Sequence, residues 1–151
     1  MPVTTRSPKA AAQDTGWRLE FPAGIPAFEQ ETAFVLLRPP ETEPLVFLQS
    51  EKTAGLCFLA VPVERVVPDY ELALSAEDRI SVGFAEKRPA APGELVTFAI
   101  LTPVGRDITA NLLAPVVVNV ASGKAVQAVR SDNRYSARTP VRFADREAGG
   151  C

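Results

Sequence analysis

Few side chains in this sequence could do chemistry, and the chain contains no histidine. Asp69 and Glu71 alternate along an expected extended segment, so their carboxylates point the same way and could bind a divalent metal or exchange protons. Cys57 could act as a nucleophile only beside a base that activates its thiol, and histidine is the usual base at neutral pH. A small enzyme that uses Asp69, Glu71 or Cys57 is one hypothesis. Solvated surface carboxylates are the simpler interpretation.

Sequence motifs for cofactor and metal sites are missing. Neither a phosphate-binding loop nor Gly-x-Gly-x-x-Gly occurs, and the nearest fragment, SGKA at residues 122–125, lacks the first glycine and the final hydroxyl of a phosphate loop. No cluster of cysteines, histidines and carboxylates has the spacing of a metal site. We therefore expect no enzymatic activity, no cofactor and no metal.

Arginines recur every four residues near the C-terminal end and would form a basic stripe for RNA if the segment were helical. They are Arg130, Arg134, Arg138, Arg142 and Arg146, with Tyr135 and Phe143 between them. Residues 131–133 and Pro140 interrupt any such helix. A β-barrel that binds RNA or a nucleotide is a second hypothesis. The simpler interpretation is a basic surface segment without a base-stacking platform, and we expect no direct nucleic-acid binding.

The elements that must position these side chains are short apolar runs bounded by proline and glycine. They cover residues 32–37, 45–50, 56–61, 95–102, 112–120 and 125–130. Such lengths, rich in Val, Phe and Thr, are typical of strands, and fourteen prolines leave little room for long helices. Residues 75–80 offer one or two helical turns, and residues 116–130 a hairpin. Consecutive apolar positions require cover on both faces, as in a closed barrel or a sandwich. We predict an all-β, single-domain antiparallel β-barrel-like fold with short loops.

The 151 residues suit one domain. Residues 1–14 are expected to be a disordered N-terminal tail, residues 15–145 the β-barrel domain, and residues 146–151 a frayed C-terminal tail. Cys57 is expected to be a buried small hydrophobe and Cys151 a dangling thiol, a usage that fits a reducing cytosol. No apolar run of about 18 residues and no signal peptide is seen, so we expect a cytoplasmic protein with no membrane contact. A closed barrel favours a monomer.

Charge is divided along the chain. Residues 20–78 hold eleven acids and three bases, whereas residues 79–146 hold ten bases and five acids. The charges of the two halves could intermix on one surface. Alternatively, an acidic face could attract a basic partner and repel nucleic acid.

Residues 21–29, FPAGIPAFE, should form a stiff, tight loop. Pro22 and Pro26 restrict φ, and Gly24 between them permits a positive φ. If Ile25 and Phe28 face inward, they close the end of a barrel. If they face outward, they form a rigid apolar anchor for a partner.

Five motifs in this order resemble the FliW family of flagellar assembly factors. They are FPAGIPAFE at residues 21–29, FLQS at 47–50, PDYE at 68–71, TANLLAP at 109–115 with VN at 118–119, and YSAR at 135–138. The resemblance covers about residues 17–143. Ala27 stands where the family usually has a second glycine.

The resemblance implies a non-catalytic bacterial cytosolic protein that binds flagellin. It also implies binding to the translational repressor CsrA, with allosteric antagonism that couples flagellin synthesis to secretion. We expect these residues to face partners: Ile25, Phe28, Glu29, Glu31, Asp69, Tyr70 and Pro115, the last at a strand edge or bulge. Others should maintain the fold: Phe21, Pro22, Gly24, Pro26, Asn111, Asn119, Tyr135 and Arg138, with the two asparagines bonding turns and strand ends.

Overall fold

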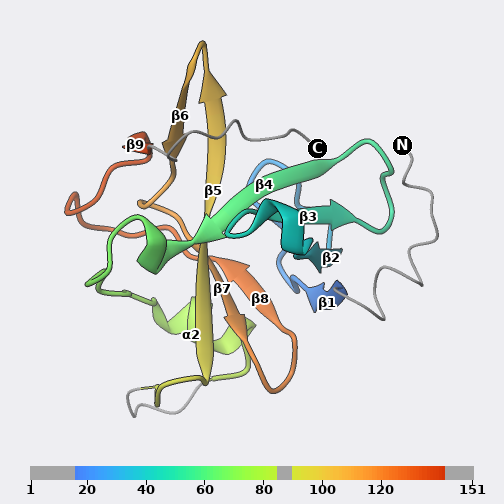
Figure 1. The fold of residues 1–151 in the computed structure, drawn as a ribbon. Coiled ribbons are helices and arrows are strands. Elements are labelled where there is room, and N and C mark those ends of the chain that lie inside the picture. Colours follow the sequence, from blue (N-terminus) through green and yellow to red (C-terminus); the bar gives the residue numbers. More distant parts are fainter. Residues whose placement is uncertain (1–15, 85–89, 142–151) are drawn as a thin grey trace.

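The computed structural model describes residues 16–84 and 90–141 of the chain and is built on antiparallel strands (Figure 1). The strands are β1 (Gly16–Glu20), β2 (Ala33–Leu37), β3 (Val46–Ser50), β4 (Cys57–Pro62), β5 (Leu95–Val104), β6 (Asp107–Ala110), β7 (Val116–Asn119), β8 (Ala125–Gln127) and β9 (Thr139–Val141). Between the strands, the described ranges also contain helix α2 (Ala76–Ser81) and the 3-10 turns η1 (Pro40–Thr42) and η2 (Val63–Arg65). The predicted all-β fold with little helix is confirmed.

Strand β5 connects two parts of the sheet, and Figure 1 shows it running the length of the molecule. Strands β1 to β5 pair in chain order, each antiparallel to the next. The first half of β5 also pairs with β7, and its second half pairs with β6. Strand β8 extends the first part beside β7, and β9 extends the second beside β6. The predicted hairpin is β7–β8.

The sheet curls like a barrel without closing. A single parallel bridge joins Glu20, at the end of β1, to Lys124 in the β7–β8 turn. The Glu20 N–H donates to the Gly123 carbonyl at 2.9 Å. Gly123 has φ 78°, and a Cβ there would lie 3.0 Å from the Arg18 carbonyl oxygen. The close approach of β1 therefore favours glycine in this turn.

The consecutive apolar residues of β7 are buried on both faces, as the run predicts. Val116 and Val118 lie in the barrel core with Phe21, Phe34 and Leu48. Val117, between them, packs in a second cluster beneath α2, with Val82, Phe84, Val126 and Ala128. A third cluster fills the space between β4, the second half of β5 and β6. Burial on both faces explains why this strand shows no polar alternation.

Helix α2 begins where the sequence predicts. The Ser75 hydroxyl accepts from the Asp78 N–H at 3.0 Å, which satisfies one of the free donors of the first turn. Glu77 and Asp78 in that turn complement the helix dipole. The helix ends before Gly83, whose φ of 72° stops the turn.

Several sequence predictions lie outside the described residues. These are the tails at residues 1–14 and 146–151, together with Cys151, Arg142, Phe143 and Arg146. Cys57 is only half-buried, at the start of β4, so the prediction of a buried residue was wrong. Within the described ranges, no helix is long and apolar enough to cross a membrane.

Candidate functional site

The loop at residues 21–29 is fixed at both ends. The Phe21 ring is fully buried, and its N–H donates to the Thr32 carbonyl at 2.8 Å. Gly24 has φ 72°, and a Cβ at this position would lie 2.3 Å from the Glu29 carbonyl oxygen. No other residue fits such a close approach without moving the backbone. Pro22 and Pro26 lie on the exposed side of the loop.

The two apolar side chains of this loop point in different directions. Ile25 is 2% exposed and belongs to the barrel core. Phe28 is 41% exposed, and its ring meets Phe58 edge to face, with centroids 5.8 Å apart. The structure therefore combines the two alternatives that the sequence left open. Ile25 closes the barrel end, and Phe28 presents an aromatic ring at the surface.

Glu31 ties this loop to the β3–β4 turn. Its carboxylate accepts from the Ser50 hydroxyl at 2.6 Å and from the Thr53 hydroxyl at 2.7 Å. These bonds, Ser50 first, lower the pKa of Glu31 below its ordinary value. The Ser50 oxygen in turn accepts from the Thr53 N–H at 2.9 Å. The Glu31 carboxylate is thus engaged within the protein, and we leave it out of the partner-contacting surface.

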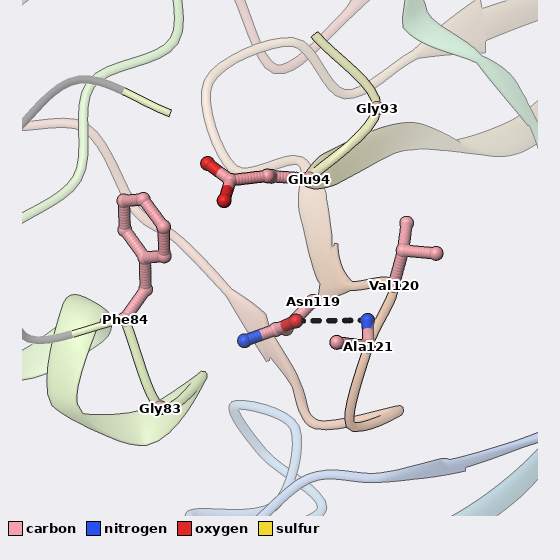
Figure 2. Close-up of a pocket in the computed structure, with 7 residues that line it drawn as sticks. All are labelled: Gly83, Phe84, Gly93, Glu94, Asn119, Val120 and Ala121. Atoms are coloured by element: carbon pink, nitrogen blue, oxygen red, sulfur yellow. Dashed lines mark hydrogen bonds between the residues drawn. The ribbon is translucent and has the colours of Figure 1, made fainter. Parts of the chain in front are cut away.

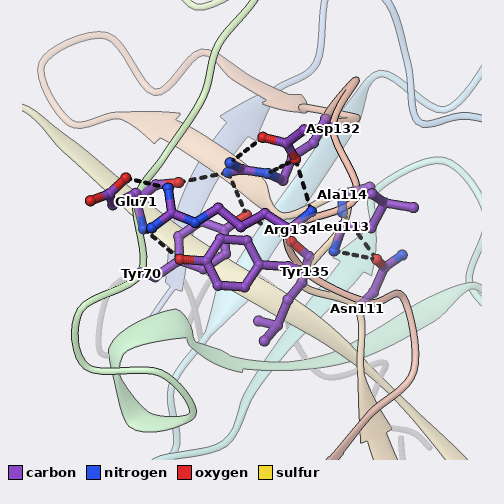
Figure 3. Close-up of polar contacts among 10 residues, drawn as sticks. Tyr70, Glu71, Asn111, Leu113, Ala114, Asp132, Arg134 and Tyr135 are labelled. Carbon is purple, nitrogen blue, oxygen red and sulfur yellow. Dashed lines mark hydrogen bonds and ion pairs between the residues drawn. The ribbon is translucent and has the colours of Figure 1, made fainter.

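A second set of polar residues joins two segments far apart in sequence (Figure 3). We call it the arginine–tyrosine cluster, and it comprises Tyr70, Glu71, Arg130, Asp132, Arg134 and Tyr135. The rings of Tyr70 and Tyr135 lie 4.3 Å apart between centroids. The Tyr70 hydroxyl donates to the Leu112 carbonyl at 2.7 Å. The Tyr135 hydroxyl accepts from the Glu71 N–H at 3.2 Å.

Arg130 is the centre of the cluster, and its side chain is only 3% exposed. Its guanidinium donates to both oxygens of Asp132, at 2.8 and 2.9 Å, and to the Glu71 carbonyl at 2.6 Å. It also lies over the Tyr135 ring, 4.8 Å from the centroid. Arg130 holds the pKa of Asp132 below its ordinary value. The predicted surface arginine is thus wrong at this position, because two tyrosines and a carboxylate enclose it.

Other arginines of the series do lie on the surface. Arg134 is exposed and forms an ion pair with Glu71. Arg138 is exposed, and its N–H donates to the Ser136 hydroxyl at 3.0 Å. Glu71 is therefore an exposed, paired carboxylate, while Asp69 is exposed beside it in the turn closed by the Tyr70 N–H and the Val67 carbonyl. Tyr70 is half-buried, and burial raises its pKa.

The two asparagines bond to backbone in turns. The Asn111 Oδ1 accepts from the N–H groups of Leu113 and Ala114, at 3.1 and 3.0 Å. The Asn119 Nδ2 donates to the Val82 carbonyl at 2.8 Å, and its Oδ1 accepts from the Ala121 N–H at 3.0 Å.

Pro115 is fully buried and directly precedes β7, which has neighbours on both sides. Its carbonyl accepts from the Ala128 N–H at 2.9 Å. Of the two alternatives expected at Pro115, a strand edge or a bulge, the strand edge is therefore wrong. Like Ile25, Pro115 has no surface to offer a partner.

A shallow hollow of about 370 Å³ lies between the end of α2, the start of β5 and the β7–β8 turn (Figure 2). The Asn119 side chain at its floor bonds the backbone, as described above. The Glu94 carboxylate at its rim accepts from the Ala91 N–H at 2.7 Å. These polar groups serve the protein's own turns. Within residues 16–84 and 90–141, no group of three or more histidine, cysteine or acidic side chains could hold a metal ion.

The sequence did not predict Ser50, Thr53 and Phe58 as neighbours of the loop. In the β3–β4 turn the Ser50 hydroxyl accepts from the Thr53 N–H, and serine hydroxyls often bond to nearby backbone in turns. Their contact with Glu31 depends on strand register, which no local pattern reveals. The FLQS motif at residues 47–50 was the one signal that included Ser50.

Known proteins with this fold and sequence are flagellar assembly factors. The family model described as "FliW protein" matches residues 3–141. The flagellar assembly factor FliW of Heliobacterium modesticaldum is 38% identical over 120 residues, which cover 80% of this chain and 76% of that protein. The FliW of Desulfitobacterium hafniense is 36% identical over 132 residues, 87% and 84% of the two chains. That of Bacillus subtilis is 32% identical over 121 residues, 80% and 82% of the two.

Comparison with a solved structure leads to the same family as the sequence comparisons. The crystal structure of a flagellar assembly factor FliW superposes with a TM-score of 0.71 at 29% identity, covering 85% of this chain and 87% of the other. The open antiparallel β-barrel with its stiff loop is thus the fold of a flagellar assembly factor. The chain belongs to the FliW family.

Proposed function

We propose that this FliW-family protein is a non-enzymatic, cytoplasmic, monomeric regulator that binds flagellin and the translational repressor CsrA. It antagonises CsrA allosterically, without occupying the RNA site. Flagellin and CsrA compete for binding to this protein, which couples flagellin synthesis to flagellin secretion. The observation that carries this proposal is family membership over most of the described fold. No cofactor, membrane or nucleic acid takes part.

The distribution of acids supports a basic protein partner. Most acids between residues 20 and 78 are exposed. Glu43, Glu51 and Glu71 form ion pairs with arginines, and the other exposed acids are Glu20, Glu29, Glu41, Glu64, Asp69 and Glu77. A protein that binds RNA must offer basic surface to its phosphates. Exposed carboxylates steer such a protein to the complex and disfavour RNA phosphates nearby.

The arginine–tyrosine cluster argues against direct RNA binding. Arg130 is buried and its donors are used within the protein. Arg134 is paired with Glu71. Two of the five arginines in the basic series thus serve internal contacts, which favours a protein-binding function over an RNA-binding one.

Titration of the purified full chain with purified CsrA, and separately with flagellin, tests the proposal. The wild-type protein is expected to bind each of them at micromolar concentration or better. Asp69→Arg is expected to weaken CsrA binding by about tenfold, because it reverses an exposed charge. The unfolding midpoint should stay near that of the wild type. Asp107→Arg, an exposed charge reversal in the β5–β6 hairpin, is the matched control and should bind as the wild type does.

Failure of the wild-type protein to bind either partner would contradict the proposal. Direct binding of RNA by the protein alone, with affinity that falls steeply with salt, would favour the arginine series instead.

A further inference from the structure

The backbone around Phe28 is held in a conformation that costs free energy. Ala27 has φ 76°, in the left-handed region. This region costs a residue with a Cβ about 1–2 kcal/mol. Such a conformation persists only where the surroundings determine it, and it is found at functional loops more often than elsewhere.

Hydrogen bonds on both sides of Phe28 fix this conformation. The Phe28 N–H donates to the Ile25 carbonyl at 2.6 Å, and the Ile25 N–H donates back to the Phe28 carbonyl at 3.3 Å. The Ala27 N–H donates to the Glu29 carboxylate at 3.2 Å. Because Ile25 is locked into the core, these bonds attach the Phe28 backbone to the rigid part of the barrel.

The result is an exposed aromatic ring on a rigid support. The Phe28 ring packs in a T-shaped contact with Phe58, which contacts the barrel core. The other large apolar side chains exposed in the described part of the chain are aliphatic, namely Ile80, Val104, Val120 and Val129. A rigid aromatic ring that keeps its position loses little conformational entropy on binding, which is typical of interface anchors.

The charges beside Phe28 indicate the partner's chemistry. Glu29 is exposed, and the one contact described for its carboxylate is with the Ala27 N–H. Glu31 is occupied by two hydroxyls. A partner that covers this loop must therefore present an apolar pocket to the ring and a positive charge to Glu29.

We propose that Phe28 is the aromatic anchor of the CsrA-binding surface and that Glu29 is its rim charge. The complementary surface on the partner is an apolar pocket with a lysine or arginine at its edge. This inference rests on the proposed function, because it assigns a contact surface to a partner named there.

Phe28→Ala in the full chain, titrated with purified CsrA, tests the anchor. Affinity is expected to fall about tenfold or more, as for a truncated interface anchor. Phe28→Leu should lose less affinity than Phe28→Ala. Ile80→Ala, which truncates an apolar side chain that is 67% exposed on α2, is the matched control and should bind like the wild type. Circular dichroism and the unfolding midpoint establish that each variant is folded.

Glu29→Gln keeps an oxygen that accepts from the Ala27 N–H and removes only the charge. It should weaken binding by about threefold and make the affinity less dependent on salt. If the wild type binds CsrA and Phe28→Ala binds it with the same affinity, Phe28 is not the anchor, whereas the proposed function still holds. Absence of wild-type binding to both CsrA and flagellin would overturn the proposed function and the anchor with it.

Discussion

Arg130 holds together two segments that lie about sixty residues apart, and its replacement should therefore destabilise the fold. Arg130→Met keeps most of the apolar stem and removes the guanidinium. The variant loses the bonds to Asp132 and to the Glu71 carbonyl, and the contact with the Tyr135 ring. A hydrogen bond to a charged group contributes about 1.5–3 kcal/mol, and a partly desolvated cation–π contact about 1 kcal/mol. Asp132 is half exposed and regains water, which limits the loss.

Together these contributions give a loss of about 3 kcal/mol in the free energy of unfolding. For a chain of this size the unfolding midpoint should fall by about 6–12 °C. Urea unfolding, followed by the fluorescence of Trp17, the one tryptophan of the chain, measures the change in the free energy of unfolding. Arg134→Met is the matched control, because Arg134 is exposed and its ion pair with Glu71 is solvated. Equal stabilities of the two variants would refute the assignment of Arg130 as the centre of the cluster.

Three further predictions concern the loop at residues 21–29 and its contact with Glu31. Ala27→Gly should raise the free energy of unfolding by about 0.5–1 kcal/mol, since glycine relieves the left-handed strain but costs chain entropy. Gly24→Ala should lower it by about 2–4 kcal/mol, because a Cβ meets the Glu29 backbone. A urea midpoint that did not rise in Ala27→Gly, or did not fall in Gly24→Ala, would contradict the prediction for that variant. Because the pKa of Glu31 is lowered in the folded state, its contribution is complete above the ordinary value of 4.5 and is lost as the pH falls below it. As the pH falls from neutral to acid, the free energy of unfolding of Glu31→Gln should therefore decrease less than that of the wild type. If the two free energies decreased in parallel, the carboxylate would not stabilise the loop.

Much of the sheet could be predicted from local sequence, since strands β2, β3, β4 and β5 coincide with apolar runs that end at turns or prolines. Strands β1, β6 and β9 could not. They are three to five residues long, and β9 contains Pro140. Their pairing is decided by neighbours distant in sequence rather than by their own composition.

The sites divide in the same way. The stiffness of the loop at residues 21–29 follows from its prolines and Gly24, which act locally. The burial of Arg130 does not follow from local sequence, because Tyr70 is sixty residues away in the chain. The four-residue spacing of the arginines instead suggests a surface stripe. Glu31 also looked like an exposed acid, whereas the register of β2 against β3 brings it to Ser50.

The regulatory claim is tested most directly by adding the purified full chain to a complex of CsrA and fluorescently labelled RNA from the flagellin leader. We expect the anisotropy to fall as RNA is released, and we expect flagellin added beforehand to prevent the release. Unchanged anisotropy at saturating protein would contradict the regulatory claim.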